Sequence, residues 1–344
     1  MLASSNSRTD LLSLLTGYQL CARAEGKSPS TVRIVASSVG YFDQFLRRMG
    51  RPCDAALIGP GEIRAFILYL GQKPCFTDHP FIRERAHKLS DHSVNCYLRS
   101  IRAFWSWLVA EEIIASSPFS RVKLPRVSRK VIKTFTLNQI QRLLASIDTA
   151  SHYGYRDYTI ILTLLDTGLR VSELTGLKVS DVSFEEGIFK VLGKGNKERF
   201  VPFGREVQHC LWRYCQSHRP DPQRDGDYLF LTGDGRQLTK NRVESIMLGY
   251  ARKSDLQGVR CSPHTLRHTA AISFLRNHGD VFSLQRMLGH SSLEMTRRYC
   301  EIADTDVKRA HITASPVDNW RLLGKTNMHH GQGHSSRPKP RPTY

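Results

Sequence analysis

The chain has 344 residues, which is enough for two domains that each have a hydrophobic core of their own. It carries 50 Lys and Arg against 31 Asp and Glu, and the formal net charge of +19 is spread over both halves. A chain that is basic throughout favours a polyanionic partner, and nucleic acid fits better than a membrane surface. No apolar run approaches the length of a membrane span. The alternative at this point is a basic protein whose charge serves only to keep it in solution.

Eight cysteines are scattered without a C-x-x-C pair, which is typical of reduced thiols in the cytoplasm. The first residues lack the basic and apolar regions of a signal peptide, so we expect a cytoplasmic protein rather than an exported one. The tightest group of potential zinc ligands is His209, Cys210, Cys215 and His218. The two cysteines are separated by LWRY at a helical spacing, and the spacing of structural zinc sites is absent, so we expect no metal site.

The first part of the chain predicts a small bundle of helices. Apolar residues follow helical spacing from Leu11 to Leu46, with a break near 26–28 where Ser28 and Pro29 indicate a new helix start. A short amphipathic helix is expected over Ile63 to Leu70, and a longer one over Val94 to Ala110. Basic residues occupy the polar faces of these helices.

A second domain follows a basic connector. Residues 118–133 are punctuated by proline, lack periodicity and are strongly basic, which indicates a linker. The T-x-x-Q pattern of Thr136 to Gln139 then predicts a capping box that opens the second domain. The pattern beyond it predicts helices over Tyr158–Asp166, Val207–His218 and Asn241–Ser254, and three short strands over Asp181–Phe184, Gly187–Leu192 and Glu198–Phe203.

Two motifs in this part carry charged residues beside glycines. In TGLRVSEL, Arg170 comes just after a helix end, and Glu173 follows three residues later on the same side. Such a pair is usually an ordinary surface ion pair. In GKGNKER, Lys194 lies in the turn between the last two expected strands, where glycines let the backbone approach a ligand. An ordinary hairpin turn is the alternative.

The stretch from Ser262 to Tyr299 is the most informative. Ser262 and Pro263 predict a helix start, with the serine as N-cap. His264 and Arg267 share one face of its first turn, at the positive end of the helix dipole. An imidazole and a guanidinium at such a position favour an oxyanion, of which phosphate is the common one.

The LGH motif lies near the end of this stretch. Gly289 predicts the end of a helix and leaves His290 in the following turn. Ser291 to Glu294 reads S-x-x-E, a capping box that begins a last short helix. That helix presents Tyr299, for which a core tyrosine is the alternative when the residue is taken alone.

Taken in order, the motifs TGLRVSEL, GKGNKER, HTLRH, LGH and the following tyrosine resemble those of the tyrosine recombinases, the phage-integrase and Xer-like family. The resemblance is sharp from about Thr134 to Glu301 and looser before it. It implies a mainly helical fold, with a SAM-like helical core-binding domain and a mostly helical α+β catalytic domain that contains a small three-stranded antiparallel sheet. The expected boundaries are 1–117 for the helical domain, 118–133 for the linker, 134–324 for the catalytic domain and 325–344 for a disordered basic tail.

The resemblance implies a site-specific recombinase that cleaves and rejoins DNA through a 3′-phosphotyrosyl intermediate and a Holliday junction. It implies neither a metal ion nor a high-energy cofactor. His268 is expected to be a packing or supporting residue. The implied roles are Tyr299 as nucleophile, Arg170 and Arg267 as the clamp on the scissile phosphate, Lys194 as general acid, His264 as base and later acid, His290 as a hydrogen-bond donor to the phosphate, and Glu173 as the supporting acid.

The expected partners are a double-stranded DNA recombination site and further copies of the chain in a homo-tetramer, with or without a second recombinase. Two rivals remain open: a non-catalytic DNA-binding protein with the same fold, and a type IB topoisomerase with similar chemistry. The candidate DNA contacts are Arg99, Arg102, Arg121, Lys123, Lys197, Arg297 and Arg298.

Overall fold

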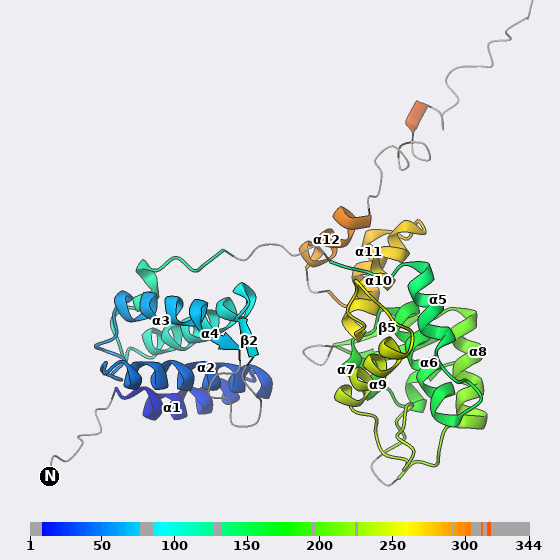
Figure 1. The fold of residues 1–344 in the computed structure, drawn as a ribbon, viewed down its shortest axis with the longest axis horizontal. Helices are drawn as coiled ribbons and strands as arrows, with labels where there is room; N and C mark the ends of the chain where they lie inside the picture. The colour runs from blue at the N-terminus through cyan, green and yellow to red at the C-terminus, as the bar shows by residue number, and fades with distance from the viewer. Residues whose placement is uncertain are drawn as a thin grey trace, which may run out of the picture. The chain divides into compact units, whose positions relative to one another are not determined.

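The computed structural model describes residues 9–75, 85–126, 132–193, 197–223, 226–290, 292–303, 311 and 315–317. The chain divides into two compact units, Met1–Lys130 and Val131–Tyr344, and both consist mostly of helices (Figure 1). In the described part of the chain no helix is both long enough and apolar enough to span a bilayer. The tail expected over 325–344 lies outside the described residues.

The first unit confirms the expected helices. Ser28 begins the second of them, because its hydroxyl accepts a hydrogen bond from the backbone N–H of Thr31 at 3.2 Å. A pair of short antiparallel strands, Pro74–Cys75 and Arg85–Lys88, was not expected from the sequence. The elements are α1 (Leu11–Ala24), α2 (Pro29–Arg48), α3 (Pro60–Gln72), β1 (Pro74–Cys75), β2 (Arg85–Lys88), α4 (Asp91–Ala110) and the 3₁₀ helix η1 (Pro118–Arg121).

Aromatic side chains fill the core of this unit. Phe42 of α2 and Trp105 of α4 are both fully buried, with ring centroids 5.7 Å apart in an edge-to-face contact. Phe119 and Val122, just after α4, join the same core. Residues 118–122, which belong to the expected linker 118–133, are therefore packed on the first unit.

The second unit confirms a mostly helical fold with a three-stranded antiparallel sheet in the order β3-β4-β5. Its elements are α5 (Leu137–Ala145), α6 (His152–Thr167), α7 (Val171–Gly176), the 3₁₀ helix η2 (Val179–Asp181), β3 (Val182–Ser183), β4 (Ile188–Leu192), β5 (Glu198–Pro202), α8 (Arg205–Arg213), the π-helical turn η3 (Tyr214–His218), α9 (Lys240–Lys253), α10 (Pro263–Arg276), α11 (Val281–Leu288) and α12 (Leu293–Ala303).

Local capping explains where two of these helices begin. The expected capping box opens α5, because the hydroxyl of Thr136 accepts from the backbone N–H of Gln139 at 3.3 Å and the Gln139 amide oxygen accepts from Thr136 at 3.0 Å. Helix α6 begins six residues before the expected start at Tyr158. Ser151 is its N-cap and accepts from the backbone N–H of Gly154 at 3.1 Å, which extends the helix through its polar first turns.

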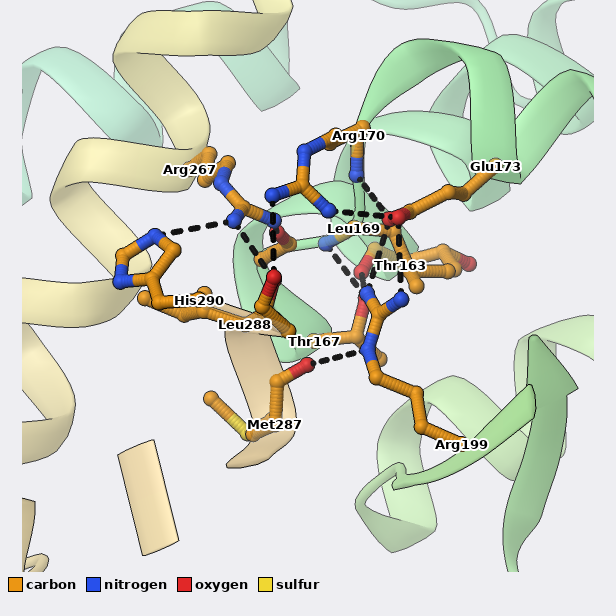
Figure 2. A network of polar contacts seen from close by, with 12 residues as sticks. Thr163, Thr167, Leu169, Arg170, Glu173, Arg199, Arg267, Met287, Leu288 and His290 are labelled. Carbon is orange, nitrogen blue, oxygen red and sulfur yellow. Dashed lines mark hydrogen bonds and ion pairs between the residues drawn. The ribbon is translucent and has the colours of Figure 1, made fainter. Parts of the chain in front are cut away.

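Helix α10 lies at the centre of the second unit. It packs against α6 and α12 and also contacts α11, which in turn contacts β5. Leu266, Ala271 and Ile272 of α10 are almost completely buried. This packing brings the C-terminal end of α6, the first turns of α10 and the C-terminal end of α11 together, and the candidate site lies there (Figure 2).

Candidate active site

Arg170 and Glu173 form a closed pair at the start of α7. The backbone N–H of Arg170, the N-cap, donates to Oε2 of Glu173 at 2.8 Å. Its Nη1 donates to Oε1 of the same carboxylate at 2.7 Å. The guanidinium of Arg170 is therefore held in one orientation, and its side chain is 29% exposed, whereas that of Glu173 is 4% exposed.

A third residue, Arg199 of β5, makes a two-pronged contact with the same carboxylate. Its Nη1 and Nη2 donate to Oε1 and Oε2 of Glu173, each at 2.9 Å (Figure 2). Burial by itself raises the pKa of Glu173, but the hydrogen bonds from Arg199 and Arg170 outweigh it, and the net pKa is lowered. Glu173 is therefore ionised at neutral pH and acts as the common counter-ion of two arginines.

Arg267 is the buried arginine of the site. Its side chain lies on α10 with the residue only 5% exposed. Nη1 donates to the carbonyl of Gly168 at 2.5 Å, and Nη2 donates to the carbonyl of Leu288 at 2.8 Å. Burial, and secondly the charge of Arg170, lower the pKa of Arg267 to about 10, so the guanidinium remains charged at neutral pH.

The C-terminal turn of α11 supplies the acceptors. Gly289 has φ +63° and ends the helix as expected, because this left-handed conformation favours glycine. The carbonyl of Gly289 accepts from Nη2 of Arg170 at 3.2 Å, and that of Met287 accepts from Nε of Arg199 at 3.0 Å. Carbonyls in the last turn of a helix have no partner within the helix and are free to orient these donors.

His290 follows directly and contacts the buried arginine. Its Nε2 lies 3.2 Å from Nη2 of Arg267, and its Nδ1 lies 3.0 Å from Oγ1 of Thr296. Because a guanidinium can only donate, Nε2 accepts, and the proton of the neutral ring is on Nδ1 and faces Thr296. Burial, together with Arg267 and Arg170, lowers the pKa of His290 to about 4, so the ring is neutral near pH 7.

This depressed pKa predicts how stability depends on pH. The unfolded chain protonates His290 near its usual pKa of 6.5, whereas the folded protein protonates it only near about 4. Acidification through this window therefore favours the unfolded state, and the free energy of unfolding is expected to fall as the pH falls from 6.5 to about 4. His290→Asn should reduce this fall, as measured by urea unfolding at a series of pH values. The exposed His209→Gln serves as the control and should leave the pH profile unchanged; an unchanged profile in His290→Asn would contradict the prediction.

Tyr299 lies on α12 and is 5% exposed. Its hydroxyl is 2.9 Å from Nδ1 of His268, and its ring is parallel to that of His290 with centroids 6.0 Å apart. Burial raises the pKa of Tyr299, against the opposing charges of Arg267 and Arg298. The hydroxyl thus contacts His268, the ring is stacked on that of His290, and the positive charge of Arg267 acts on the hydroxyl.

The structure brings five of the seven expected site residues together: Arg170, Glu173, Arg267, His290 and Tyr299. His264 lies exposed on the first turn of α10. Its charge nevertheless contributes, after burial, to lowering the pKa of His268 one turn later. Lys194 lies outside the described residues, between Gly193 and Lys197.

Two residues that the sequence did not assign to the site belong to it by geometry. Arg199 shares the inward face of β5 with the buried Val201, and the period-two alternation of the strand is the signal that could have found it. His268 was expected to be a packing or supporting residue, and it contacts the hydroxyl of Tyr299. His264 and His268 are one helical turn apart and lie on the same face of α10, so the spacing alone could not tell which of them contacts Tyr299.

Among the candidate DNA contacts, Arg99 and Arg102 of α4 line a groove of the first unit together with Arg126, with a volume of about 490 Å³. The side-chain amide of Asn95 donates to the carbonyl of Pro125 at 2.7 Å and holds the chain that forms one wall of the groove. The remaining candidates are all exposed: Arg121, Lys123, Lys197, Arg297 and Arg298. The carbonyl of Arg121 accepts a hydrogen bond from Arg64, and Arg297 forms ion pairs with Glu294 and Glu301.

Among the described residues, no group of three His, Cys, Asp or Glu is placed to hold a metal ion. His218 is instead stacked on Tyr155 with ring centroids 4.3 Å apart, and Cys210 is buried in the core. The positive charge that surrounds Tyr299 in this part of the structure comes from arginines.

Comparisons with known proteins agree on one group. Residues 133–306 match the phage integrase family. The chain is 31% identical over 286 residues to the tyrosine recombinase XerD of Listeria monocytogenes serotype 4b (strain F2365), covering 82% of this chain and 91% of the relative. It is 30% identical over 291 residues to the tyrosine recombinase XerC of Leptospira interrogans serovar Lai (strain 56601), covering 84% of this chain and 88% of the relative. The Tn1549 transposon integrase, solved in complex with transposon right end DNA, has a similar fold with a TM-score of 0.69 at 21% identity, covering 88% of this chain and 98% of the other.

Proposed function

Because the chain belongs to the phage integrase family and is a tyrosine site-specific recombinase, we propose that it cleaves and rejoins double-stranded DNA through a covalent bond between Tyr299 and a 3′ phosphate. The observation that carries this proposal is the convergence of one tyrosine hydroxyl and two guanidinium groups from distant segments. His290 lies between Arg267 and Tyr299: its Nε2 is 3.2 Å from Nη2 of Arg267, and its ring is parallel to that of Tyr299.

The two arginines suit a phosphate in transfer. The transition state is a pentacovalent phosphorus that carries two negative charges, and positive groups fixed in advance stabilise it most. Forked N–H donors match phosphate oxygens better than an ammonium does. The Nε–H of Arg267 and one of its Nη1–H groups have no acceptor among the described residues, so they remain for a phosphate oxygen.

The proposed cleavage step forms one bond and breaks one bond. The hydroxyl oxygen of Tyr299 attacks phosphorus, its proton passes to a histidine of α10, and the bond from phosphorus to the 5′ oxygen breaks. Lys194 donates a proton to that leaving oxygen as the general acid. The resemblance gives His264 the role of base, while His268, hydrogen-bonded to the hydroxyl at 2.9 Å, orients it before attack.

His290 is proposed to donate a hydrogen bond to the phosphate. In the structure its Nε2 accepts from Arg267, so donation requires a proton on that nitrogen. A bound phosphate favours this change, because a neighbouring anion raises the pKa of an imidazole.

The phosphotyrosyl bond is similar in energy to the phosphodiester that it replaces. A free 5′ hydroxyl can therefore attack it and restore the DNA backbone, and the reaction needs no high-energy cofactor. We propose that four copies of the chain bind two DNA sites and exchange strands in pairs through a Holliday junction, with or without a second recombinase. We propose that the first unit is the helical DNA-binding domain and that the second unit is the catalytic domain.

A suicide substrate tests this function. A DNA site with a nick close to the scissile phosphate loses the short 5′-hydroxyl strand after cleavage, so a covalent protein–DNA adduct should accumulate and survive denaturing electrophoresis. An intact recombination site should then give exchanged strands. Binding without an adduct would indicate a non-catalytic DNA-binding protein, and relaxation of supercoils without strand exchange would indicate a type IB topoisomerase.

The groove lined by Arg99, Arg102 and Arg126 predicts contacts with the DNA backbone. If the protein contacts six or more phosphates, affinity should fall by ~10³-fold or more between about 50 and 200 mM salt. Arg99→Gln should weaken binding to all sequences alike and lower the slope of log affinity against log salt by about 1. Gel-shift titrations at several salt concentrations measure both. An unchanged slope would show that this arginine does not contact a phosphate.

A further inference from the structure

Three consecutive carbonyls at the C-terminal end of α11 each accept a hydrogen bond from a different arginine. Met287 accepts from Arg199 at 3.0 Å, Leu288 from Arg267 at 2.8 Å and Gly289 from Arg170 at 3.2 Å. Figure 2 shows these arginines converging on the turn from different elements. A helix C-terminus carries partial negative charge, so it attracts and orients cations without neutralising them.

Arg199 differs from the other two arginines because all three of its nitrogens donate within the protein, whereas Nε of Arg170 and Nε of Arg267 have no acceptor among the described residues. Its Nε donates to Met287, and both Nη groups donate to the carboxylate of Glu173 at 2.9 Å. Its side chain is 13% exposed, against 29% for Arg170. An arginine whose three nitrogens all donate within the protein is poorly placed to bind phosphate. Arg199 nevertheless connects the carboxylate of Glu173 to the C-terminal turn of α11, and these two groups orient Arg170 and Arg267.

We propose that Arg199 is a positioning residue for strand cleavage: it fixes the carboxylate of Glu173 relative to the C-terminal turn of α11, and thereby holds Arg170 and Arg267 in the arrangement that binds the scissile phosphate. This inference rests on the proposed function. Arg199 acts through Glu173 and through the turn, without touching DNA.

The connection to Arg170 runs through one shared atom. Oε1 of Glu173 accepts from Nη1 of Arg170 at 2.7 Å and from Nη1 of Arg199 at 2.9 Å. Without Arg199, the buried carboxylate keeps only its hydrogen bonds with Arg170, and the pKa of Glu173 loses its strongest lowering influence. The carboxylate would then be free to turn toward Arg170 and to move the guanidinium away from its position.

The connection to the turn runs through Gly289. A Cβ atom at this position would lie 3.0 Å from Cζ of Arg199, closer than ordinary packing. The guanidinium of Arg199 therefore packs directly against Gly289. The carbonyl of Gly289 orients Arg170, and His290 is the next residue in the chain. A displacement of about 1 Å in a catalytic group can cost about 10²-fold in rate, so the loss of this support should be measurable.

The test separates cleavage from binding. Arg199→Gln and Arg199→Lys are compared with the wild type on the nicked suicide substrate, under single-turnover conditions with the DNA fully bound. Affinity and its salt dependence are measured by gel shift on the same preparations. Arg236→Gln is the matched control, because it removes an arginine of an exposed ion pair with Asp234 in the same unit and should change nothing.

For Arg199→Gln we expect wild-type affinity, an unchanged salt slope and cleavage slowed by about 10²-fold. Arg199→Lys should fall between this variant and the wild type, since an ammonium cannot reproduce the two-pronged contact. Cleavage at the wild-type rate in either variant would overturn the proposal. So would a salt slope lowered by about 1, because that result identifies a phosphate contact. If Arg199→Gln does not fold, Arg199→Lys decides by the same criteria.

A double-mutant cycle with Glu173→Gln tests the route. If Arg199 acts partly through Glu173, the double variant should lose less cleavage rate than the product of the two single losses. Losses that multiply would show independent roles and sink the proposal. A wild-type protein that forms no adduct would refute the proposed function and this inference together, whereas a normal adduct in both wild type and Arg199 variants would refute the inference alone.

Discussion

Tyr299→Phe is expected to abolish the covalent protein–DNA adduct while the protein still binds its DNA site. The substitution removes one oxygen atom and keeps the ring, which is 5% exposed and parallel to His290, so the packing of α12 should be preserved. Without the nucleophilic oxygen no phosphotyrosyl bond can form, and cleavage should fall by at least about 10⁴-fold. Denaturing electrophoresis of the reaction with labelled nicked DNA measures the adduct, and a gel shift measures binding.

The matched control for this experiment is Tyr250→Phe. This residue also loses a hydrogen-bonded hydroxyl in the same unit, since Tyr250 donates to Asp157 at 3.1 Å, but it lies on α9 outside the site. Tyr250→Phe should form the adduct as the wild type does. An adduct that persists in Tyr299→Phe would place the nucleophile elsewhere, and Cys300 beside it would be the first residue to examine by peptide mapping.

Arg267→Gln is expected to have the second-largest effect, a reduction of the cleavage rate by about 10³-fold or more. The substitution removes a charge that is buried beside the tyrosine, and it leaves the carbonyls of Gly168 and Leu288 without their donor. Because these carbonyls are buried, the loss of their donor should also lower the free energy of unfolding, by about 1–3 kcal/mol for each carbonyl left unpaired. Single-turnover cleavage and urea unfolding measure the two effects separately.

Two further variants make this result specific. Arg267→Lys keeps the charge, but one ammonium cannot serve two carbonyls and a phosphate in the same geometry, so cleavage should remain well below wild type. Arg276→Gln removes an exposed arginine from the same helix and should cleave normally. A folded Arg267→Gln protein that cleaves within a few-fold of the wild-type rate would contradict the assignment of Arg267 to the phosphate.

The hydrogen bond between Tyr299 and His268 bears on how the nucleophile is used. The hydroxyl is held at 2.9 Å by an imidazole whose pKa is lowered by burial and by His264, so this ring is neutral and able to accept the phenolic proton. The resemblance gives the role of base to His264, which is exposed. Comparing the cleavage rates of His264→Ala and His268→Ala on the nicked substrate separates the role of base from that of orientation.

Much of this molecule follows from its sequence. Capping residues and the spacing of apolar side chains are local, so the helices after Ser28 and Thr136 and the turn at Gly289 begin and end where the sequence predicts. The place of Arg267 in the first turn of a helix likewise made it a candidate for binding an oxyanion, because that physical reason is local. Arg170 and Glu173 became candidates only through the resemblance, since taken alone they predicted an ordinary surface ion pair.

Only the tertiary structure decided how these pieces meet. Arg199 is adjacent in the fold to Glu173 and Met287, residues 26 and 88 positions away, and no local pattern relates them. Likewise, the rotation of α10 against α12 determined that His268, one turn beyond His264, contacts Tyr299. Local propensity fixes where a helix begins, whereas the packing of buried faces fixes its rotation and its neighbours, and hydrogen bonds between distant residues depend on that packing alone.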